Sequence, residues 1–283
     1  MQLLVSLLQN LPEYKQLLAA VDNGACPAAV SGLAPVHRAL FAAALRRESG
    51  RPVAVVCADD DECQRMADDL HALTGETALT LPARELTFHN AAVVSRQWEQ
   101  RRLSVLHALT EGTVPLLVVP ANALCQRTLP PALLSKTART LKAGGSYDLT
   151  ELAEHLTLAG YSRCDQVEGV GQFALRGGIL DFFSPAHPQP ARVEFWGDDV
   201  DSMGLFDPVS QRRTEALQEA VILPAAEVLP QLAPGGAAGL ALELEKRIAA
   251  FEKKKGDFTG ILSTLREDGE KLENGLSFPA IDR

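Results

Sequence analysis

The chain has 283 residues, of which 46% are hydrophobic and 22% charged, as in globular proteins that bury a sizeable core. Because one domain takes about 150 residues, this length predicts two domains, with a third piece possible. The formal net charge of −9 argues against broad non-specific binding to DNA, which needs clustered lysine and arginine. The N-terminal apolar run has no basic region, and no run of about 18 apolar residues follows. We therefore expect neither a signal peptide nor a transmembrane span, and favour a cytoplasmic protein.

The first half of the chain alternates between strand and helix patterns. Its strand runs are apolar and rich in β-branched residues, and its helical runs repeat their apolar residues every three or four positions. Strands that are apolar on both faces and alternate with helices are typical of a parallel sheet covered by helices. We therefore predict an α/β domain over residues 1–138. Its expected strands are 28–31, 52–57, 78–81 and 114–119, and its expected helices are 1–21, 35–47, a helix after Asp59, and 95–110.

Asp59 follows an apolar strand, and Glu62 stands three residues later. This spacing predicts an N-terminal helix cap. Asp59, Asp60 and Asp61 together also resemble a magnesium-binding acidic pair. The cap, with first-turn acids that the helix dipole favours, is the simpler interpretation.

The pattern changes after a turn-rich joint at residues 142–148. One helix, whose leucines share a face, begins at Leu149 and stops at Gly160. Short strands follow, separated by turns rich in glycine, proline and aspartate. This pattern predicts an α+β domain of one helix and an antiparallel sheet over residues 139–213. Its expected strands are 165–168, 172–176, 179–183, 191–196 and 200–206.

The last part of the chain, residues 214–283, begins with one more expected strand in the run EALQEAVILP. A linker, APGGAAG, and two expected helices over 240–254 and 259–274 follow. The final run, GLSFPAIDR, is apolar and ends without a cap or a polar tail, so we expect a fragment of a longer protein.

Side-chain alternation on the expected strand 191–196 separates two faces. Val193 and Phe195 point toward a core, and Arg192, Glu194 and Trp196 point the other way. Arginine and tryptophan are frequent anchors of protein interfaces, so this face suits partner recognition. The alternative is a solvated strand with one amphipathic tryptophan, and the strand by itself leaves both open.

A degenerate phosphate loop lies between an expected strand and an expected helix. In the pattern GxxxxGK[ST], Gly32 is present, but His37, Arg38 and Ala39 replace the second glycine, the lysine and the metal-binding hydroxyl. A Cβ at the second glycine and the missing N–H of Pro35 spoil the cradle of backbone donors that holds phosphates. We therefore expect no nucleotide hydrolysis here.

Other chemistry finds little support in the sequence. The six histidines show no HxH or HExxH spacing, and the five cysteines form no CxxC pair, so the sequence predicts no metal site. No GxSxG or comparable motif supports catalytic residues.

The run from 160 to 212 resembles the excision-repair protein UvrB, and more closely the N-terminal UvrB-homology module of the Mfd family of bacterial transcription-repair coupling factors. The matching motifs are RGGILDFF, RVEFWGDDVDS and LFDPVSQR, and the preceding DQV favours the coupling factors. The earlier run VVPANALCQR is also similar to that family. The likeness extends over the whole chain.

The resemblance implies a RecA-like α/β domain, with a degenerate phosphate loop, that an inserted α+β domain interrupts and that resumes over residues 214–283. It also implies that the inserted domain recruits the damage-recognition protein UvrA. By motif, the binding residues fall on Arg176, Arg192 and Glu194, with an aromatic position at Trp196 that is more often phenylalanine in the family. A further basic position of the family falls on Ala174, which is a departure from the pattern.

The same resemblance implies an adaptor without catalysis or cofactor in this fragment. ATP and magnesium would serve a translocase motor elsewhere in the full-length protein, and RNA polymerase and DNA would bind through its other domains. Two alternatives stay open: an ATP-binding, UvrB-like helicase subunit, and a free-standing DNA-binding domain, which the acidic composition disfavours.

Overall fold

The computed structural model describes residues 6–25, 27–84, 97–253, 256 and 258–274. The chain divides into two compact units. Unit 1 contains Met1–Glu85 and Val105–Arg127, and unit 2 contains Leu86–Ser104 and Thr128–Arg283. In the described part of the chain, no helix combines the length and the apolar character that crossing a membrane requires.

Unit 1 contains a parallel three-stranded sheet in the order β1-β3-β2. The central strand β3 pairs along its length with β1, from Val53 opposite Leu116 to Cys57 opposite Pro120. The strands form where β-branched and leucine residues run together, as the sequence predicts. Their bounds are Val53–Cys57 for β1, Leu79–Thr80 for β2 and Leu116–Pro120 for β3.

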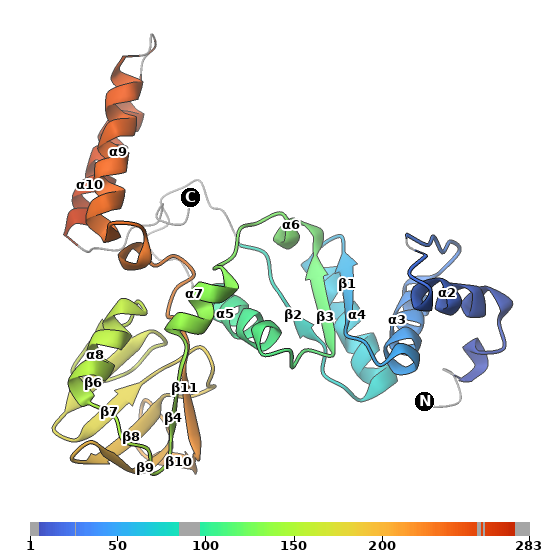
Figure 1. Ribbon diagram of the computed structural model, residues 1–283, viewed down its shortest axis with the longest axis horizontal. Helices are drawn as coiled ribbons and strands as arrows, with labels where there is room; N and C mark the ends of the chain where they lie inside the picture. Colours follow the sequence, from blue (N-terminus) through green and yellow to red (C-terminus); the bar gives the residue numbers. More distant parts are fainter. Residues whose placement is uncertain (1–5, 26, 85–96, 254–255, 257, 275–283) are drawn as a thin grey trace. The chain divides into compact units, whose positions relative to one another are not determined.

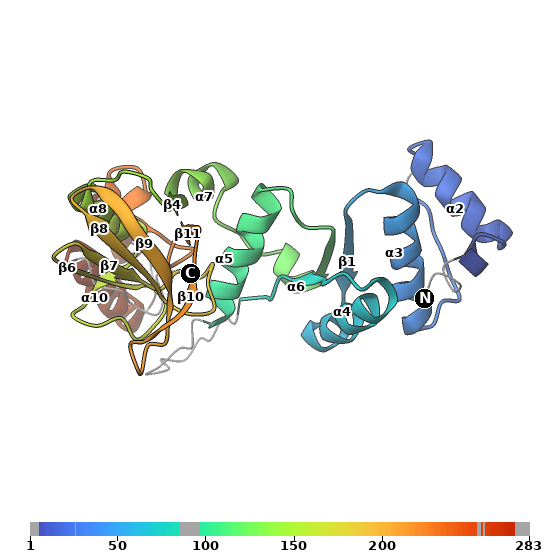
Figure 2. The same ribbon diagram turned by 90° about the horizontal axis from the view of Figure 1, so that it is seen from below.

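Helices pack on both faces of this sheet (Figures 1 and 2). Alternate residues of β3 point to opposite faces. Leu116 and Val118 pack with buried residues of α3 and α4, and Val119 packs with Val105 of α5 and Ala123 of α6. The bounds are Pro12–Asp22 for α2, Pro35–Ser49 for α3, Asp60–Thr74 for α4, Gln97–Thr110 for α5 and Ala121–Leu124 for α6.

The cap predicted at the start of α4 is confirmed. The Asp59 carboxylate accepts a hydrogen bond from Glu62 N at 2.7 Å, and the Glu62 carboxylate accepts one from Ala58 N at 2.8 Å. The two side chains thereby satisfy backbone donors that have no partner within the helix.

The prediction of a strand at residues 28–31 is wrong. Residues 27–34 form no strand and are largely exposed. This run is rich in alanine, which has little preference for strands, and none of the strands in the described residues pairs with it. The segment before Gly32 therefore lacks the strand that a phosphate loop follows.

Unit 2 is built around a six-stranded sheet in the order β10-β9-β8-β7-β6-β5, in which only β5 and β6 pair in parallel. The bounds of its strands are Ser162–Arg163, Gln172–Arg176, Ile179–Phe182, Ala191–Trp196, Asp199–Phe206 and Arg213–Ala216 for β5 to β10 in order. A separate antiparallel pair joins β4, Arg139–Lys142, to β11, Glu219–Ile222. The mixed parallel and antiparallel sheets confirm the α/β class expected for the chain.

One face of the six-stranded sheet packs against α8, Leu149–Leu158. Leu152 and Leu156 of this helix meet Leu180, Phe182 and Val193 of the sheet in a fully buried cluster. The helix predicted at Leu149 is thus confirmed, and Gly160 ends it with a φ of +88° that favours glycine.

The prediction of a strand at residues 165–168 is wrong. The Gln172 side chain accepts hydrogen bonds from Glu168 N and Gly169 N and closes a turn there. Val167 is buried in this turn, against Ala174 and Phe206, and its apolar side chain is the signal that resembled a strand.

Antiparallel pairing continues past residue 213, where the sequence placed the end of the α+β domain. β10 pairs with β9, and β11 pairs with β4, so two strands form where one was expected. Residues 214–283 fall in unit 2 by their contacts.

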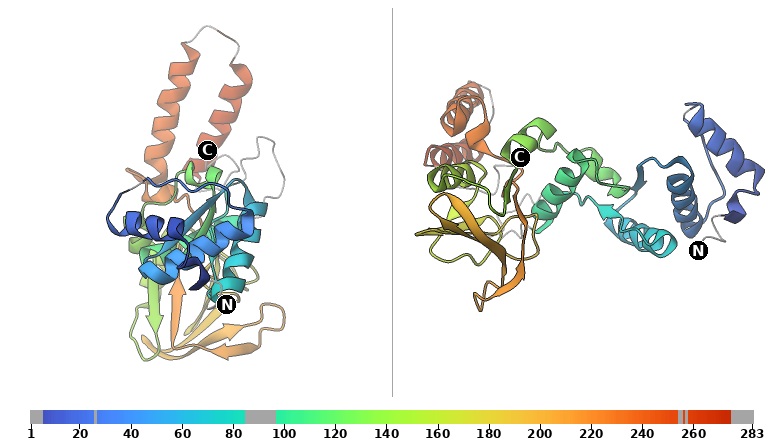
Figure 3. Two further views of the ribbon diagram at one scale, coloured as in Figure 1. Left: turned by 90° about the vertical axis from the view of Figure 1, so that its right-hand side faces the viewer. Right: turned by 60° about the horizontal axis from the view of Figure 1, so that its bottom comes forward.

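Three further helices of unit 2 are α7, Pro131–Thr137, α9, Gly236–Glu252, and α10, Thr259–Glu273. α9 and α10 lie side by side, with Ala241 packed against Leu272 (Figures 1 and 3). The run 275–283, read as an unfinished end, lies outside the described residues.

Candidate protein-interaction surface

The face of the six-stranded sheet that points away from α8 carries a row of charged side chains. It arises from alternation: Ala191 and Val193 of β8 are buried on the α8 side, so Arg192 and Glu194 lie on the opposite face. A bulge follows, because Glu194 pairs with Ser202 but the next residue pairs with Val200.

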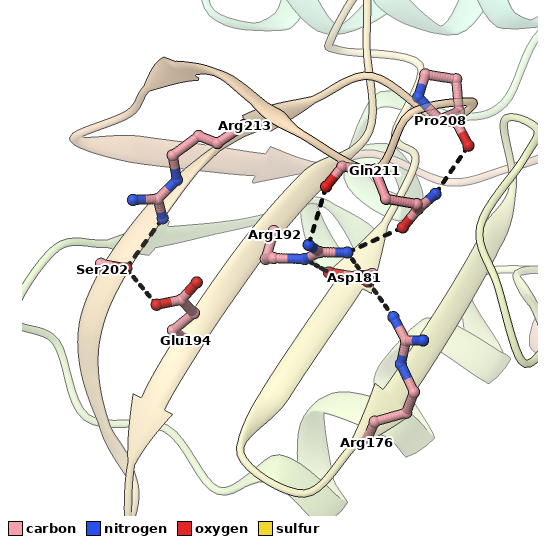
Figure 4. A network of polar contacts seen from close by, with 8 residues as sticks. All are labelled: Arg176, Asp181, Arg192, Glu194, Ser202, Pro208, Gln211 and Arg213. Carbon is pink, nitrogen blue, oxygen red and sulfur yellow. Dashed lines mark hydrogen bonds and ion pairs between the residues drawn. The ribbon is translucent and has the colours of Figure 1, made fainter.

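Asp181 of β7 stands at the centre of this row (Figure 4). Its side chain is 1% exposed and accepts three hydrogen bonds from two arginines. Arg192 donates from Nε at 2.7 Å and from Nη2 at 2.8 Å, which is a bidentate contact. Arg176 donates from Nη2 at 2.8 Å. One buried carboxylate therefore holds both guanidinium groups on the sheet.

Arg192 is the less accessible of the two arginines, with 21% of its side chain exposed. Its guanidinium carbon stands 4.4 Å from the centroid of the Phe206 ring, and its Nη1 and Nη2 donate to Gln211 O and Gln211 Oε1 at 3.4 Å and 3.0 Å. The hydrogen bond to Asp181 is the main reason that the pKa of Arg192 is raised. The outward orientation that alternation predicts is correct for the face, but most donors of Arg192 are already bound within the chain.

Arg176 is more accessible, with 52% of its side chain exposed. It stands at the end of β6, next to the tight turn that leads into β7. Within the described part of the chain, Asp181 is the only residue that its guanidinium binds. Of the two arginines, Arg176 is the one whose donors can reach a partner without rearrangement.

Glu194 and Trp196 also differ in accessibility, because Glu194 is bound within the chain and Trp196 is exposed. Glu194 accepts a hydrogen bond from Ser202 Oγ at 2.9 Å, and that oxygen accepts one from Arg213 Nη2 at 2.9 Å (Figure 4). Trp196 lies at the end of β8 beside the turn into β9 and is 84% exposed. The indole is therefore free to contact a partner.

The part of the chain that contains this sheet is similar to a known domain family. Residues 140–227 match the model of the UvrB interaction domain. This stretch belongs to the UvrB interaction domain family. The match runs from the second residue of β4 to beyond β11, so it includes the strands beyond residue 213.

Similarity to curated proteins extends beyond the UvrB interaction domain. The chain is 30% identical over 261 residues to the transcription-repair-coupling factor of Bacillus subtilis, which covers 92% of this chain and 21% of that protein. It is 36% identical over 205 residues to that of Myxococcus xanthus, and 30% over 213 residues to that of Escherichia coli, covering 70% and 75% of this chain. The resemblance seen in the sequence is confirmed. The chain spans between 16% and 21% of the length of these three relatives.

Ala174, where the coupling-factor family can carry a basic residue, is 1% exposed. It packs against Val167 and Phe206 in a small cluster beneath the charged row of the UvrB interaction domain. An alanine therefore fills an apolar position here.

Sequence reasoning missed two residues that organise the surface of the UvrB interaction domain. Asp181 gave a signal, because it is the one charge in the apolar strand ILDF and alternation places it on the face of Arg192. Gln211 gave none, because its contact with Arg192 depends on how the turn after β9 folds back.

The degenerate phosphate loop lies in unit 1, apart in sequence from the UvrB interaction domain. Gly32 has a φ of +80°, as a loop glycine does, and His37 is exposed in the first turn of α3. Arg38 donates from Nη1 to the Glu62 carboxylate at 3.2 Å, and Ala39 is fully buried in the core. The residue in the metal-ligand position therefore points into protein.

Proposed function

We propose that this chain is a UvrA-recruiting adaptor module of a transcription-repair coupling factor, and that it links stalled RNA polymerase to nucleotide excision repair. The binding surface would be the face of the UvrB interaction domain that carries Arg176, Arg192, Glu194 and Trp196. The observation that carries the proposal is the exposed Arg176 on the same sheet as an 84% exposed Trp196, within a domain that matches this family.

The chemistry of this face supports a protein partner. Arg176 and Arg192 share one carboxylate, so together with Asp181 they leave one net positive charge on a chain whose formal charge is −9. A guanidinium fork binds carboxylates through paired hydrogen bonds, and an indole supplies apolar contact area. The surface therefore suits a partner that offers an acidic side chain beside an apolar patch.

The contributions of the four residues should differ. Arg176 and Trp196 can contact a partner directly, and truncation of a central arginine or tryptophan costs about 2 kcal/mol or more, which is roughly a 30-fold loss of affinity. Glu194 is already bound to Ser202, and Arg192 to Asp181, so their truncation would act partly through the sheet.

The test is a titration of purified UvrA with the wild-type chain and with the Arg176→Ala and Trp196→Ala variants. Matched controls are Arg247→Ala and Leu242→Ala on α9, which are exposed and lie outside residues 140–227. Each site variant should lose at least tenfold in affinity, and each control should stay within twofold. Site variants that bind like the wild type would discard the surface.

The proposal includes an inert nucleotide site and no catalysis in this chain. It is supported by the buried Ala39 and by the ion pair that occupies Arg38. No observation favours the alternative, an ATP-binding UvrB-like helicase subunit. Thermal unfolding with ATP and magnesium separates the two, because a ligand that binds only the folded protein raises the melting temperature. A rise of several degrees would favour the helicase.

The remaining assignments rest on resemblance to the coupling factors. We place RNA polymerase and DNA contacts, and an ATP-dependent motor with magnesium, in other parts of the longer relatives, and we propose a cytoplasmic location. The helices on both faces of the β1-β3-β2 sheet are compatible with a RecA-like domain, which we propose for unit 1.

A further inference from the structure

The turn between β9 and β10, residues 207–211, presents an apolar side chain to solvent. Val209 at its tip is 89% exposed, although such turns usually carry glycine, asparagine, aspartate or serine. Its neighbours are tightly bound. Asp207 Oδ1 accepts a hydrogen bond from Ser210 N at 2.6 Å, and Gln211 N donates to Asp207 O at 2.8 Å. The turn is thus a fixed structure that holds a valine in water.

Gln211 is the residue on which this conformation depends. Its φ of +59° lies in the left-handed region, and it is the only non-glycine residue of the described chain with a positive φ. Its side chain donates to Pro208 O at 2.8 Å and accepts from Arg192 Nη2 at 3.0 Å (Figure 4). Backbone in this region persists where surrounding contacts enforce it, and such positions cluster at binding sites.

Arg192 connects this turn to the centre of the charged row. The same guanidinium group that binds Asp181 twice also binds the backbone and the side-chain oxygen of Gln211. One side chain therefore fixes the turn relative to the sheet, and hence fixes where Val209 stands relative to the charged row.

The two exposed apolar residues flank the arginines along the strand direction. Trp196 ends β8, and the turn follows β9 at the opposite end of β8, where Phe206 N donates to Pro190 O. Five residue steps along β8 correspond to roughly 17 Å. A standard protein interface covers roughly 800 Å² on each partner, which is about 30 Å across, so one partner can cover both ends.

We propose that the turn 207–211 is a second contact element of the UvrA-binding surface, with Val209 as its apolar anchor, and that Arg192 is a positioning residue for this turn. The proposal rests on the proposed function and deepens it. UvrA would present carboxylates opposite Arg176, with apolar side chains on two sides, one meeting Trp196 and the other Val209.

The first experiment measures UvrA affinity for the wild-type chain, Val209→Ser and Leu242→Ser. Val209 is almost fully exposed, so its replacement should leave the melting temperature unchanged and lower the affinity five- to tenfold. Leu242→Ser, on the exposed side of α9, should stay within twofold of the wild type. Val209→Ser binding within twofold of the wild type, while Arg176→Ala binds at least tenfold more weakly, overturns the inference and leaves the proposed function standing. A wild-type chain that does not bind UvrA overturns both.

The second experiment tests whether Arg192 acts through the turn. In the Arg192→Ala background, Val209→Ser should have no further effect on affinity, because the valine has already lost its fixed place. Hydrogen exchange at the amides of Ser210 and Gln211 should accelerate in Arg192→Ala, and not in Arg176→Ala. Additive losses of affinity, together with an unchanged exchange rate in the turn, would overturn the positioning role.

Discussion

Replacing Asp181 by alanine removes the carboxylate on which both arginines of the surface depend. Asp181 is almost fully buried, and three charge-assisted hydrogen bonds converge on it from Arg176 and Arg192. Their loss leaves the Arg192 guanidinium over the Phe206 ring without its anion. We expect a destabilisation of this sheet by about 3 kcal/mol.

The magnitude follows from the exposure of each partner. Breaking a fully buried ion pair costs about 3–5 kcal/mol, and the partial exposure of Arg192 reduces this, because water can reach its guanidinium. Arg192→Ala should therefore cost about 2–3 kcal/mol, including the cation–π contact with Phe206. The half-exposed Arg176 should contribute less than about 1 kcal/mol.

The assay is urea-induced unfolding, monitored through the hydrogen exchange of peptides from β7 and β8. These peptides report on this sheet separately from unit 1. The expected order of destabilisation is Asp181→Ala, then Arg192→Ala, then Arg176→Ala. For UvrA affinity, Arg176→Ala should instead have a large effect. If Arg176→Ala destabilises the sheet as much as Arg192→Ala, or if Asp181→Ala costs less than about 1 kcal/mol, the reasoning from exposure is wrong.

Three further predictions concern the rest of the fold. Arg102 and Glu227 form a fully buried ion pair at 2.8 Å, so Arg102→Ala should lower the free energy of unfolding by at least about 3 kcal/mol in a urea titration. The double variant Arg102→Met with Glu227→Leu should recover most of this loss, because it leaves no buried charge without a partner. A double variant less stable than Arg102→Ala would contradict this. Burial lowers the pKa of His187, whose Nε2 accepts from Val221 N, so the unfolded chain takes up a proton that the folded chain refuses. Stability is therefore lost as pH falls below 6.5 toward the folded pKa, and His187→Gln should lose less than the wild type in melting temperatures measured from pH 7 to 5. Equal losses would exclude His187 as the source. Asp59→Ala should cost about 1 kcal/mol by thermal unfolding, and an unchanged melting temperature would exclude a capping role.

Local sequence determined most elements of this protein. The alternation in ARVEFW placed β8 and sorted its two faces, and the Asp59 cap and Gly160 stop marked helix ends correctly. These signals depend on neighbours a few positions away, which is why they can be read from one sequence. They fail where an apolar residue is buried by a turn instead of a strand, as at Val167.

Only the tertiary structure determined which side chains of the surface bind one another. Which side chains share Asp181 depends on the lateral order of β6, β7 and β8, and on the depth at which the carboxylate is buried. The positive φ of Gln211 is enforced by contacts with Arg192, 19 positions earlier. The sequence thus predicted which face carries the arginines, because alternation is local. It could not predict that Arg192 is bound and Arg176 accessible, because that difference arises from contacts between strands that only folding brings together.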